Sequence, residues 1–312
     1  MSDLNREILE KLGSFTKLLR KEVSLKISSG VDITELIDFI EIRIFEAGYL
    51  PSFPAMVSVN DMAAHYTIFD EGYILQKGDV IKVDFGVSFQ GYITDNAFTV
   101  EVESNEHEDL ISCARACLEA AVERAEIGAT MNDIGFVVYE VAKQRGFNTI
   151  HNLSGHQIAR NNLHCGLGVP NYANGDMSLI KNDMQFAIEP FITYGQPKIK
   201  ACRLSNILHL VRDKPVRDPI AMKVLKHIRE HFPKLPFSKR WLVQSVIDEN
   251  LLGKPKFKGF EKQRVLHAIR VLKTNGVIYE YDELGTIDGS IVAQFEDCVL
   301  FENNEKTIIT RL

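Results

Sequence analysis

The sequence predicts an α+β fold in which a helical segment interrupts a body of helices and strands. Two observations indicate the body: apolar residues recur every three or four positions in the first fifty residues, and every second position between residues 80 and 102. A third observation indicates the interruption, because a helical pattern returns between residues 213 and 286, before the chain ends in a strand-like run. We therefore expect a body of residues 1–212 and 287–312, and an inserted helical subdomain at 213–286.

The elements of the body follow from local patterns. Gly48 closes the second of two helical runs, and the Pro-bounded stretch after it is expected to be an extended segment and loop. The segment "SGHQIARNNLHCG" has no clear period, so we interpret it as a loop. The expected helices are residues 4–19, 32–48, 107–125 and 131–146, and the expected strands are the hairpin at 80–102 and residues 184–194, 199–211 and 291–304.

The inserted segment carries its own start signal. Asp218 followed by Pro219 is typical of a helix N-cap with proline at the first helical position. Three helical runs follow, and "VIYEYDEL" is interpreted as a short ribbon after them. Three helices and a ribbon resemble a winged-helix module. The helical runs are residues 220–232, 238–252 and 261–276.

Composition excludes several classes of protein. Of the 312 residues, 45% are hydrophobic and 25% are charged, which is typical of a folded globular chain rather than a disordered one. The N-terminal region has charges throughout and no apolar run, so we expect neither signal peptide nor membrane span, and a cytoplasmic protein. The five cysteines form no Cys-x-x-Cys pair, which favours free, buried thiols.

The net charge of −6 conceals an asymmetry. Residues 214–275 contain 15 Lys and Arg against 5 Asp and Glu, a local charge of +10, so the remainder carries −16. Such a basic segment favours a polyanionic partner, although a solvated helical face is the more common explanation.

Two aspartates of the hairpin are expected to share one face. If Gln90 and Gly91 form the turn, Asp95 lies opposite Gly86, and Asp84 lies on the same face two residues away. The two carboxylates are then diagonal neighbours, about 7–8 Å apart at Cα. A register slip of one residue would send them to opposite faces.

Further acids lie in apolar strands. Glu189 is flanked by apolar residues in "FAIEPF", where an unpaired carboxylate would cost several kcal/mol, so it needs a cation or a donor. Pro190 indicates the end or edge of that strand. In "IVAQFEDCVLF", Glu296 lies on one face with Gln294, and Asp297 on the other, so either acid can point inward.

Taken singly, these residues have ordinary explanations, since an aspartate in a strand is usually an edge or turn residue and a lone histidine usually a capping or core residue. As a set, two aspartates, two glutamates and a histidine suit a pair of divalent metal ions bridged by carboxylates. No thiolate belongs to the set, which disfavours a structural zinc site.

Blocks through nearly the whole chain resemble one family. The sequence is similar to the type 2 methionine aminopeptidases, of the short archaeal-like form, which have the pita-bread (creatinase-like) fold. More than a hundred residues separate Glu189 from Glu296, as the type 2 insertion implies. Two departures concern the pocket rim: no proline follows "HYT", and the region after Glu189 is less glycine-rich than in many relatives. The matching blocks are "PSFPAMVSVNDMAAHYT", "DVIKVDFGVSFQGYITDNAFTV", "NLSGHQIARNNLHCGLGVPN", "FAIEPF", "LPFSKRW" and "AQFEDCVLF".

The resemblance implies a site as well as a fold. It implies metal ligation by Asp84, Asp95, His156, Glu189 and Glu296. It also implies that His65 and His164 are catalytic and substrate-binding histidines, with Glu189 as the proton shuttle. The methionine side chain would lie against Phe53, Leu163 and Phe191.

The expected function is therefore removal of the N-terminal methionine from nascent proteins when the second residue is small. Two divalent cations (Co, Mn, Fe or Zn) would activate the water that hydrolyses the first peptide bond. We expect a monomer with no membrane partner, whose basic residues 214–275 associate with the ribosome.

Two alternatives remain. An Xaa-Pro aminopeptidase or prolidase of the same fold would share the five ligands, but usually has a separate N-terminal domain, for which there is no room before His65. A non-catalytic ribosome-binding or nucleic-acid-binding relative would use the basic segment, and the intact ligand set disfavours that as the sole function.

Overall fold

The computed structural model describes residues 4–70, 72–253 and 260–311. The expected helices of the body are present within a few residues of their predicted bounds. None of the described helices combines the length and the apolar character needed to cross a bilayer. The helices are α1 (Arg6–Ser24), α2 (Ile33–Glu46), α3 (Glu108–Arg124), α4 (Met131–Gln144), α5 (Pro219–His231), α6 (Lys239–Asp248) and α7 (Phe260–Thr274).

The strands of the described residues form five small antiparallel sheets. In the order of their hydrogen bonding, these are β1 (Leu50–Pro51), β5 (Val87–Phe89) and β6 (Tyr92–Ile93); β2 (Met56–Val59), β4 (Val80–Phe85) and β7 (Asn96–Glu101); β16 (Val292–Gln294), β12 (Phe191–Thr193) and β8 (Asn148–Thr149); β10 (Asn162–Pro170), β9 (Ser154–Ala159), β11 (Met184–Ile188), β17 (Asp297–Glu302) and β18 (Glu305–Ile308); and β14 (Phe237–Ser238), β13 (Ile199–Leu210), β15 (Ile278–Thr286) and β3 (Met62–Ala64).

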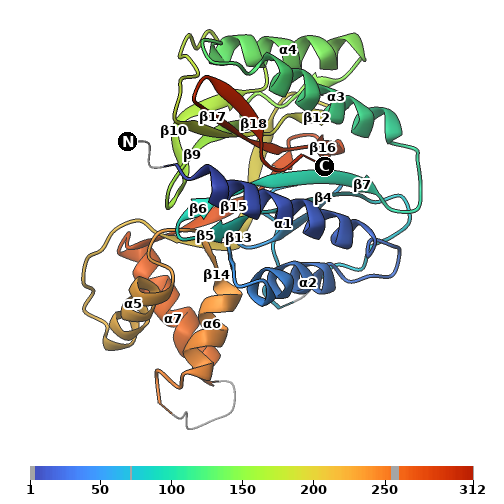
Figure 1. Cartoon of the computed structure of the whole chain (residues 1–312). Coiled ribbons are helices and arrows are strands. Elements are labelled where there is room, and N and C mark those ends of the chain that lie inside the picture. Colours follow the sequence, from blue (N-terminus) through green and yellow to red (C-terminus); the bar gives the residue numbers. More distant parts are fainter. Residues whose placement is uncertain (1–3, 71, 254–259, 312) are drawn as a thin grey trace.

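Two helix pairs enclose the strands of the body. Helices α1 and α2 pack together against β1, β2, β5 and β6, and α3 and α4 pack together against β8, β10, β12 and β16. Figure 1 shows the strands running between these pairs, with α5, α6 and α7 projecting from one end. The apolar faces of both pairs meet the strands in one continuous core, which holds the strand ends in fixed positions.

The hairpin register is confirmed. Phe89 pairs with Tyr92 across the Gln90-Gly91 turn, and Asp84 pairs with Ala97 further along the same two segments. Both pairings belong to a single register, so no slip separates the turn from the aspartates. Gln90 and Gly91 both have positive φ, as a tight two-residue turn requires.

The predicted loop at residues 154–166 is wrong. This segment forms strands β9 and β10, which pair antiparallel with register shifts between Asn162 and Cys165 and between Cys165 and Gly168. The bulges displace successive side chains from the regular alternation of a strand, and this is why the sequence lacks a period of two. Strands β8 and β18 were likewise not expected.

The thiol prediction is correct in part. All five cysteines are free, and Cys113, Cys117 and Cys298 are buried. Cys165 is half-buried, however, and Cys202 is exposed. Both lie on irregular strands, β10 and β13, where sequence alternation does not indicate which side faces solvent.

The inserted helices enclose a second apolar core. Helix α5 begins at Pro219 with the Asp218 side chain accepting a hydrogen bond from the Ala221 N–H, as the sequence predicts. Helices α5, α6 and α7 pack on one another and on β13 and β15. The expected short ribbon is the first part of β15, which pairs with the body strand β13 over most of its length. This core supports the proposal that residues 213–286 form an inserted unit.

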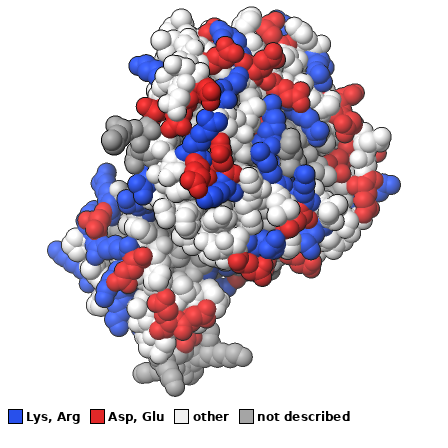
Figure 2. Space-filling model, in the orientation of Figure 1, with Lys and Arg blue, Asp and Glu red and all other residues white. Residues whose placement is uncertain are grey.

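Among the described residues, five basic residues of the insert pair with acids outside residues 214–275. Figure 2 shows Lys and Arg side chains on the flank of the insert that α5 occupies, with acidic side chains between them. Lys254, Lys256 and Lys258 lie outside the described residues. The pairs formed with acids outside residues 214–275 are Arg229 with Asp213, Lys239 and Lys273 with Glu280, Arg240 with Asp38 and Glu41, and Lys262 with Asp70.

Candidate metal centre

A cavity of about 360 Å³ lies where the sheets meet, and its walls contain every residue singled out in the sequence as a candidate site residue. Eight further residues of the wall were not anticipated: Met56, Ala64, Asn152, Leu153, Ser154, Ile207, Pro236 and Tyr281. The candidate residues are Phe53, His65, Asp84, Asp95, His156, Leu163, His164, Glu189, Phe191 and Glu296.

The two aspartates reach the cavity from the hairpin. Asp84 is on β4, between Met56 of β2 and Ala97 of β7. Asp95 lies between β6 and β7, in the short interruption of the hairpin. Both side chains are almost fully buried, at 8% and 4% exposed. The shared face that the register predicts is therefore the face that lines the cavity.

The two glutamates lie where paired strands change sheets. The β11–β17 ladder ends at the pair Ile188 and Asp297, and the β12–β16 ladder begins at Phe191 and Gln294. Glu189 and Glu296 occupy the break between the two ladders. Pro190 has no N–H for a ladder, which is consistent with the end of β11 one residue before Glu189.

A backbone hydrogen bond joins the two halves of the site. The N–H of Glu296 donates to the carbonyl oxygen of Ala97, at 2.9 Å, and so links β7 to the segment between β16 and β17. The Gln294 side chain, on the same side as Glu296 in the sequence pattern, donates to Oε2 of Glu189 at 3.1 Å. Gln294 thus supplies the donor that the buried Glu189 was expected to need.

The open choice between two neighbouring acids is settled by their partners. Glu296 lines the cavity, whereas Asp297 accepts a hydrogen bond from Nε of Arg311 at 2.8 Å. Asp297 is 2% exposed and makes its ion pair away from the cavity. Alternation in the sequence indicated two faces but not which face was the cavity side.

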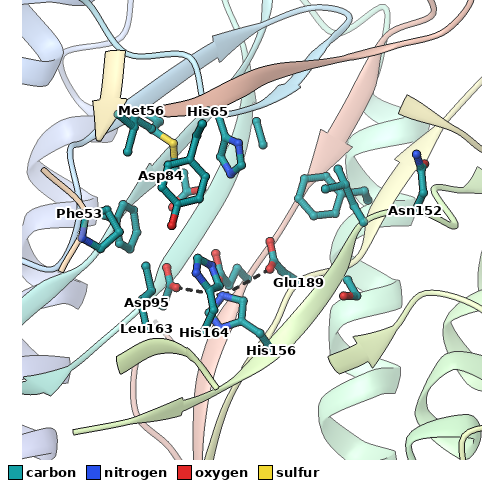
Figure 3. A pocket seen from close by; sticks show the side chains of 18 residues that line it. Phe53, Met56, His65, Asp84, Asp95, Asn152, His156, Leu163, His164 and Glu189 are labelled. Carbon is teal, nitrogen blue, oxygen red and sulfur yellow. Dashed lines mark ion pairs between the residues drawn. The ribbon is translucent and has the colours of Figure 1, made fainter. Parts of the chain in front are cut away.

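His156 completes the group from strand β9. Its Nε2 atom is 3.5 Å from Oδ2 of Asp95 and 3.7 Å from Oε1 of Glu189. Figure 3 shows the labelled side chains of Asp84, Asp95, His156 and Glu189 turned toward a common centre. Asp95, His156 and Glu296 each offer a ligand atom within 4.8 Å of the others.

The cavity is electrostatically unfavourable for carboxylates without a cation. Burial raises the pKa of Asp84, Glu189 and Glu296 well above the usual range, and repulsion from neighbouring carboxylates raises it further. Burial also raises the pKa of Asp95 to about 8 and lowers the pKa of His156 to about 4. A neutral histidine among crowded carboxyl groups is the electrostatic signature of a cation site.

The unpaired atoms point to the same conclusion. Within the described residues, Oδ1 of Asp84 and Oε1 of Glu296 are buried without a hydrogen-bond partner. The nitrogen–oxygen separations of 3.5 and 3.7 Å around His156 Nε2 are too long for direct hydrogen bonds. They match ligand atoms that share one ion at about 2.0–2.2 Å from each. Oxygen and imidazole ligands of this kind fit divalent transition metals.

Two further histidines face the cavity from opposite sides. Nδ1 of His65 lies 2.9 Å from the carbonyl oxygen of Asp282, which can only accept, so Nδ1 carries the proton and Nε2 of the neutral ring is an acceptor. Burial lowers the pKa of His65, which favours that neutral form. His164 projects from β10 with its ring 4.3 Å from the His156 ring. His65 has φ of +64°, a left-handed backbone that turns its side chain off strand β3.

Apolar side chains line the rest of the cavity. The wall contains the expected Phe53, Leu163 and Phe191, each at most 6% exposed. Met56 and Ile207 extend this wall, and Tyr281 stands edge-to-face on His65 at 5.4 Å. Of these, Tyr281 belongs to "VIYEYDEL", whose alternating pattern indicated a strand but gave no sign that it reaches the site. An apolar wall beside a polar cluster is typical of a substrate pocket.

The chain resembles known proteins in sequence and in structure. Residues 7–212 match the model of metallopeptidase family M24. The chain is 38% identical over 308 residues to a methionine aminopeptidase of Thermococcus onnurineus (strain NA1), covering 98% of this chain and 99% of that protein.

Solved structures at lower identity share the fold. A methionine aminopeptidase from Thermotoga maritima has a TM-score of 0.68 at 20% identity, covering 99% of this chain and 98% of that one. A thermophilic Arx1 has a TM-score of 0.81 at 15% identity, covering 98% and 91%. The expected pita-bread architecture is thereby confirmed.

Proposed function

The chain belongs to metallopeptidase family M24, and on that premise we propose that it is a type 2 methionine aminopeptidase that removes the N-terminal methionine of nascent proteins. The observation that carries the proposal is the cavity itself. Four carboxylates and His156 line it, and the apolar side chains of Phe53, Leu163 and Phe191 line it as well. A peptide N-terminus with an apolar first side chain fits this combination.

Asp84, Asp95, His156, Glu189 and Glu296 would hold two divalent cations of Co, Mn, Fe or Zn. When bound, the cations would make hydroxide available near neutral pH and polarise the scissile carbonyl. Two ions, rather than one, are favoured because the five side chains offer more oxygen atoms than a single tetrahedral ion can use. Carboxylates are also the ligands best suited to bridge two ions.

Glu189 would act as the proton shuttle. Its Oε2 accepts a hydrogen bond from Gln294, which fixes the carboxylate, while Oε1 faces His156 and the metal centre. A carboxylate held in this way can take a proton from the attacking water and pass it to the leaving amine. Gln294 is therefore a positioning residue for this step.

The two cavity histidines would handle the substrate. Nε2 of His65 is an acceptor, so it can receive a hydrogen bond from an N–H group of the substrate. His164, exposed on β10 beside the centre, is placed to donate to the oxygen of the tetrahedral intermediate. Phe53, Leu163 and Phe191 would contact the methionine side chain. A second residue larger than alanine or serine would be disfavoured beyond it.

The runner-up is a proline-specific peptidase of the same fold, which the same metal centre can serve. The full-length similarity to a methionine aminopeptidase favours the methionine-specific reaction. We also propose a cytoplasmic monomer whose exposed α5 lysines, Lys223 and Lys226, contact ribosomal RNA. Binding of this kind would weaken steeply as salt is added, and salt-independent binding to ribosomes would contradict it.

A substrate comparison tests the reaction. Metal-stripped protein is restored with Mn²⁺ or Co²⁺, and release of the first residue is followed from Met-Ala-Ser and from an Ala-Pro peptide. We expect metal-dependent release of methionine alone, and loss of that release in His156→Ala. Cleavage of the Ala-Pro peptide alone would assign the chain to the proline-specific peptidases, and activity on neither peptide would reject both.

A further inference from the structure

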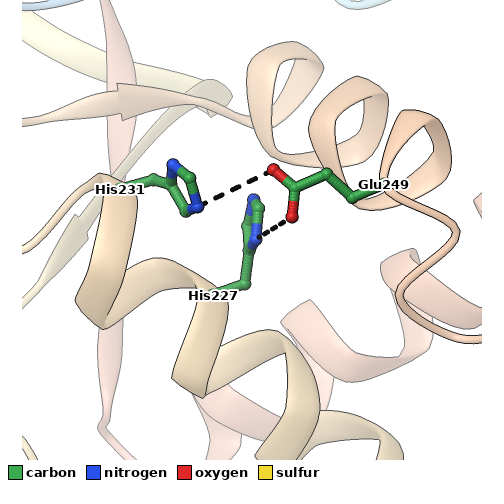
Figure 4. A group of neighbouring side chains, drawn as sticks. All are labelled: His227, His231 and Glu249. Atoms are coloured by element: carbon green, nitrogen blue, oxygen red, sulfur yellow. Dashed lines mark ion pairs between the residues drawn. The ribbon is translucent and has the colours of Figure 1, made fainter.

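A second histidine cluster lies in the insert, remote from the catalytic cavity. His227 and His231 are four residues apart on α5, and Glu249 is the C-cap residue of α6. Figure 4 shows the three side chains turned toward one another. One ligand atom from each lies within 4.8 Å of the other two. Histidines at this spacing lie on one face of a helix, as in known zinc-binding helices.

His227 turns Nε2 toward Ser245 and Nδ1 toward Glu249. The Ser245 hydroxyl donates to the carbonyl oxygen of Leu242 at 3.3 Å, so its oxygen is free to accept from Nε2 of His227 at 2.8 Å. In a neutral ring the other nitrogen, Nδ1, then has a lone pair. This lone pair points at Oε2 of Glu249, 3.3 Å away. In this tautomer two acceptors face each other, and a cation between them would remove the repulsion.

The helix ends add negative potential at the same place. His231 is the last residue of α5, and Glu249 caps the C-terminus of α6, where a carboxylate opposes the helix dipole. Nε2 of His231 is 3.7 Å from Oε1 of Glu249. The negative carboxylate of Glu249 therefore lies at the negative end of the α6 dipole, which is unfavourable. A bound cation would offset both the carboxylate and the two helix ends.

We propose that His227, His231 and Glu249 form a zinc site that clamps α5 to the end of α6. Two His and one carboxylate are a zinc ligand set, and ligands at 2.0–2.2 Å from a tetrahedral ion are about 3.3–3.6 Å apart. Each histidine lies close to this separation from one oxygen of the carboxylate, His227 Nδ1 at 3.3 Å from Oε2 and His231 Nε2 at 3.7 Å from Oε1. Ser245 would be the outer partner that orients the His227 ring. Water would complete the coordination, since His231 and Glu249 are half-exposed.

The clamp would hold a segment that reaches the catalytic cavity. Residues 232–236 connect α5 to β14, and Pro236 lines both that cavity and a separate cavity of about 760 Å³. His231 lies at the start of this segment and lines the larger cavity. Zinc at the cluster would fix the start of the segment without touching the reacting atoms. Its role is structural, and it does not depend on the proposed function.

Zinc counting with matched variants tests the proposal. The whole chain is dialysed against buffered Zn²⁺ and the bound metal is measured by mass spectrometry. We expect His231→Ala and Glu249→Gln to bind one zinc ion fewer per chain than the wild type. The control is His267→Ala, an exposed histidine of the same insert that pairs with Asp218, and it should keep the wild-type count.

A second variant separates zinc binding from a simple ion pair. Ser245→Ala leaves all three ligands in place but removes the orienting hydrogen bond, so we expect about 10- to 100-fold weaker zinc binding at this site. None of the substituted residues lines the catalytic cavity, so we expect its metal content to be unchanged in every variant and the counts to differ only through the insert. Equal zinc counts in wild type, His231→Ala and Glu249→Gln would overturn the proposal and leave a proton as the cation between His227 and Glu249.

Discussion

Glu189 combines three properties that rarely coincide in one side chain. Its side chain is only 13% exposed, it accepts a hydrogen bond from Gln294, and its second oxygen faces His156. Burial alone would favour its protonated form, and burial is the main reason its pKa is raised. A group that is costly to ionise yet surrounded by ligand atoms is poised to exchange a proton.

We expect Glu189→Gln to lower the rate of methionine release by about 10²- to 10⁴-fold, because the amide cannot carry the proton. The volume is kept, so the circular dichroism spectrum and thermal midpoint should change little. The measurement is kcat on Met-Ala-Ser with saturating metal. Glu123→Gln, an exposed glutamate on α3, serves as the control. Wild-type kcat in Glu189→Gln would show that another group moves the proton.

At the scale of elements, one glycine allows strand β9 to approach β11. A Cβ at Gly155 would lie 2.3 Å from the carbonyl oxygen of Ala187 and 3.1 Å from Cβ of Val169. The neighbouring atoms belong to the Ala187 backbone and to the branched Val169 side chain. Neither can move aside to make space for an added methyl group. Because His156 follows directly and pairs with Ala187, the position of this metal-facing histidine depends on the close approach.

We therefore expect Gly155→Ala to destabilise the fold by about 1–3 kcal/mol and to weaken metal binding through His156. Urea unfolding and metal titration measure the two effects. The control is Gly168→Ala on the neighbouring strand, where the nearest atom to an added Cβ is Ser154 Oγ at 3.4 Å, an ordinary contact. Equal stability of the two variants would contradict the importance of the close approach.

At the scale of the whole molecule, Glu41 fastens the insert to the body. Its carboxylate accepts hydrogen bonds from Arg240 at 2.7 Å and from Trp241 Nε1 at 2.8 Å, both on α6 of the insert, and from the Ala55 N–H at 3.3 Å. Burial raises the pKa of Glu41 to about 7, although Arg240 and Trp241 act in the opposite direction. The folded state therefore holds this proton more tightly than the unfolded chain does.

The sign of the pH dependence follows from the raised pKa. The folded pKa lies above the unfolded value of 4.5, so the stability contributed by the protonated group is complete below pH 4.5 and is lost as the pH rises to about 7. In the wild type the free energy of unfolding should decline as the pH rises over this range. We expect Glu41→Gln to remove on the order of 3 kcal/mol of that decline. Urea unfolding at several pH values measures it. Glu35→Gln, an exposed residue of the same helix, should leave the decline unchanged, and an unchanged decline in Glu41→Gln would contradict the assignment.

The hairpin shows what local sequence can specify. Alternating residues and a Gln-Gly turn are enough to set the register, and the register places Asp84 and Asp95 on one face. The alternation and the turn both depend on residues that are close in the chain, so they can be predicted without knowledge of the rest of the fold. The body helices and the start of α5 at Pro219 were predictable for the same reason.

The histidine strands show where local sequence fails. The sequence of residues 154–166 predicts a loop because the bulges of β10 disrupt the period of two, yet pairing with β11 makes β9 a strand. The alternation of residues in the sequence does not distinguish Glu296 from Asp297 as the acid on the cavity side. The structure does, because Arg311 pairs with Asp297. Tyr281 and Pro236 reach the cavity only because the insert folds back onto the body.

By itself, the sequence determined the α+β class, the body helices, the hairpin register and the types of side chain available as metal ligands, because periodicity and turn chemistry are properties of neighbouring residues. Only the tertiary structure decided which of those side chains meet at one cavity, and that Lys239, Arg240, Lys262 and Lys273 of the insert pair with Asp38, Glu41, Asp70 and Glu280. Both outcomes depend on contacts between segments far apart in the chain, and no local pattern encodes those contacts.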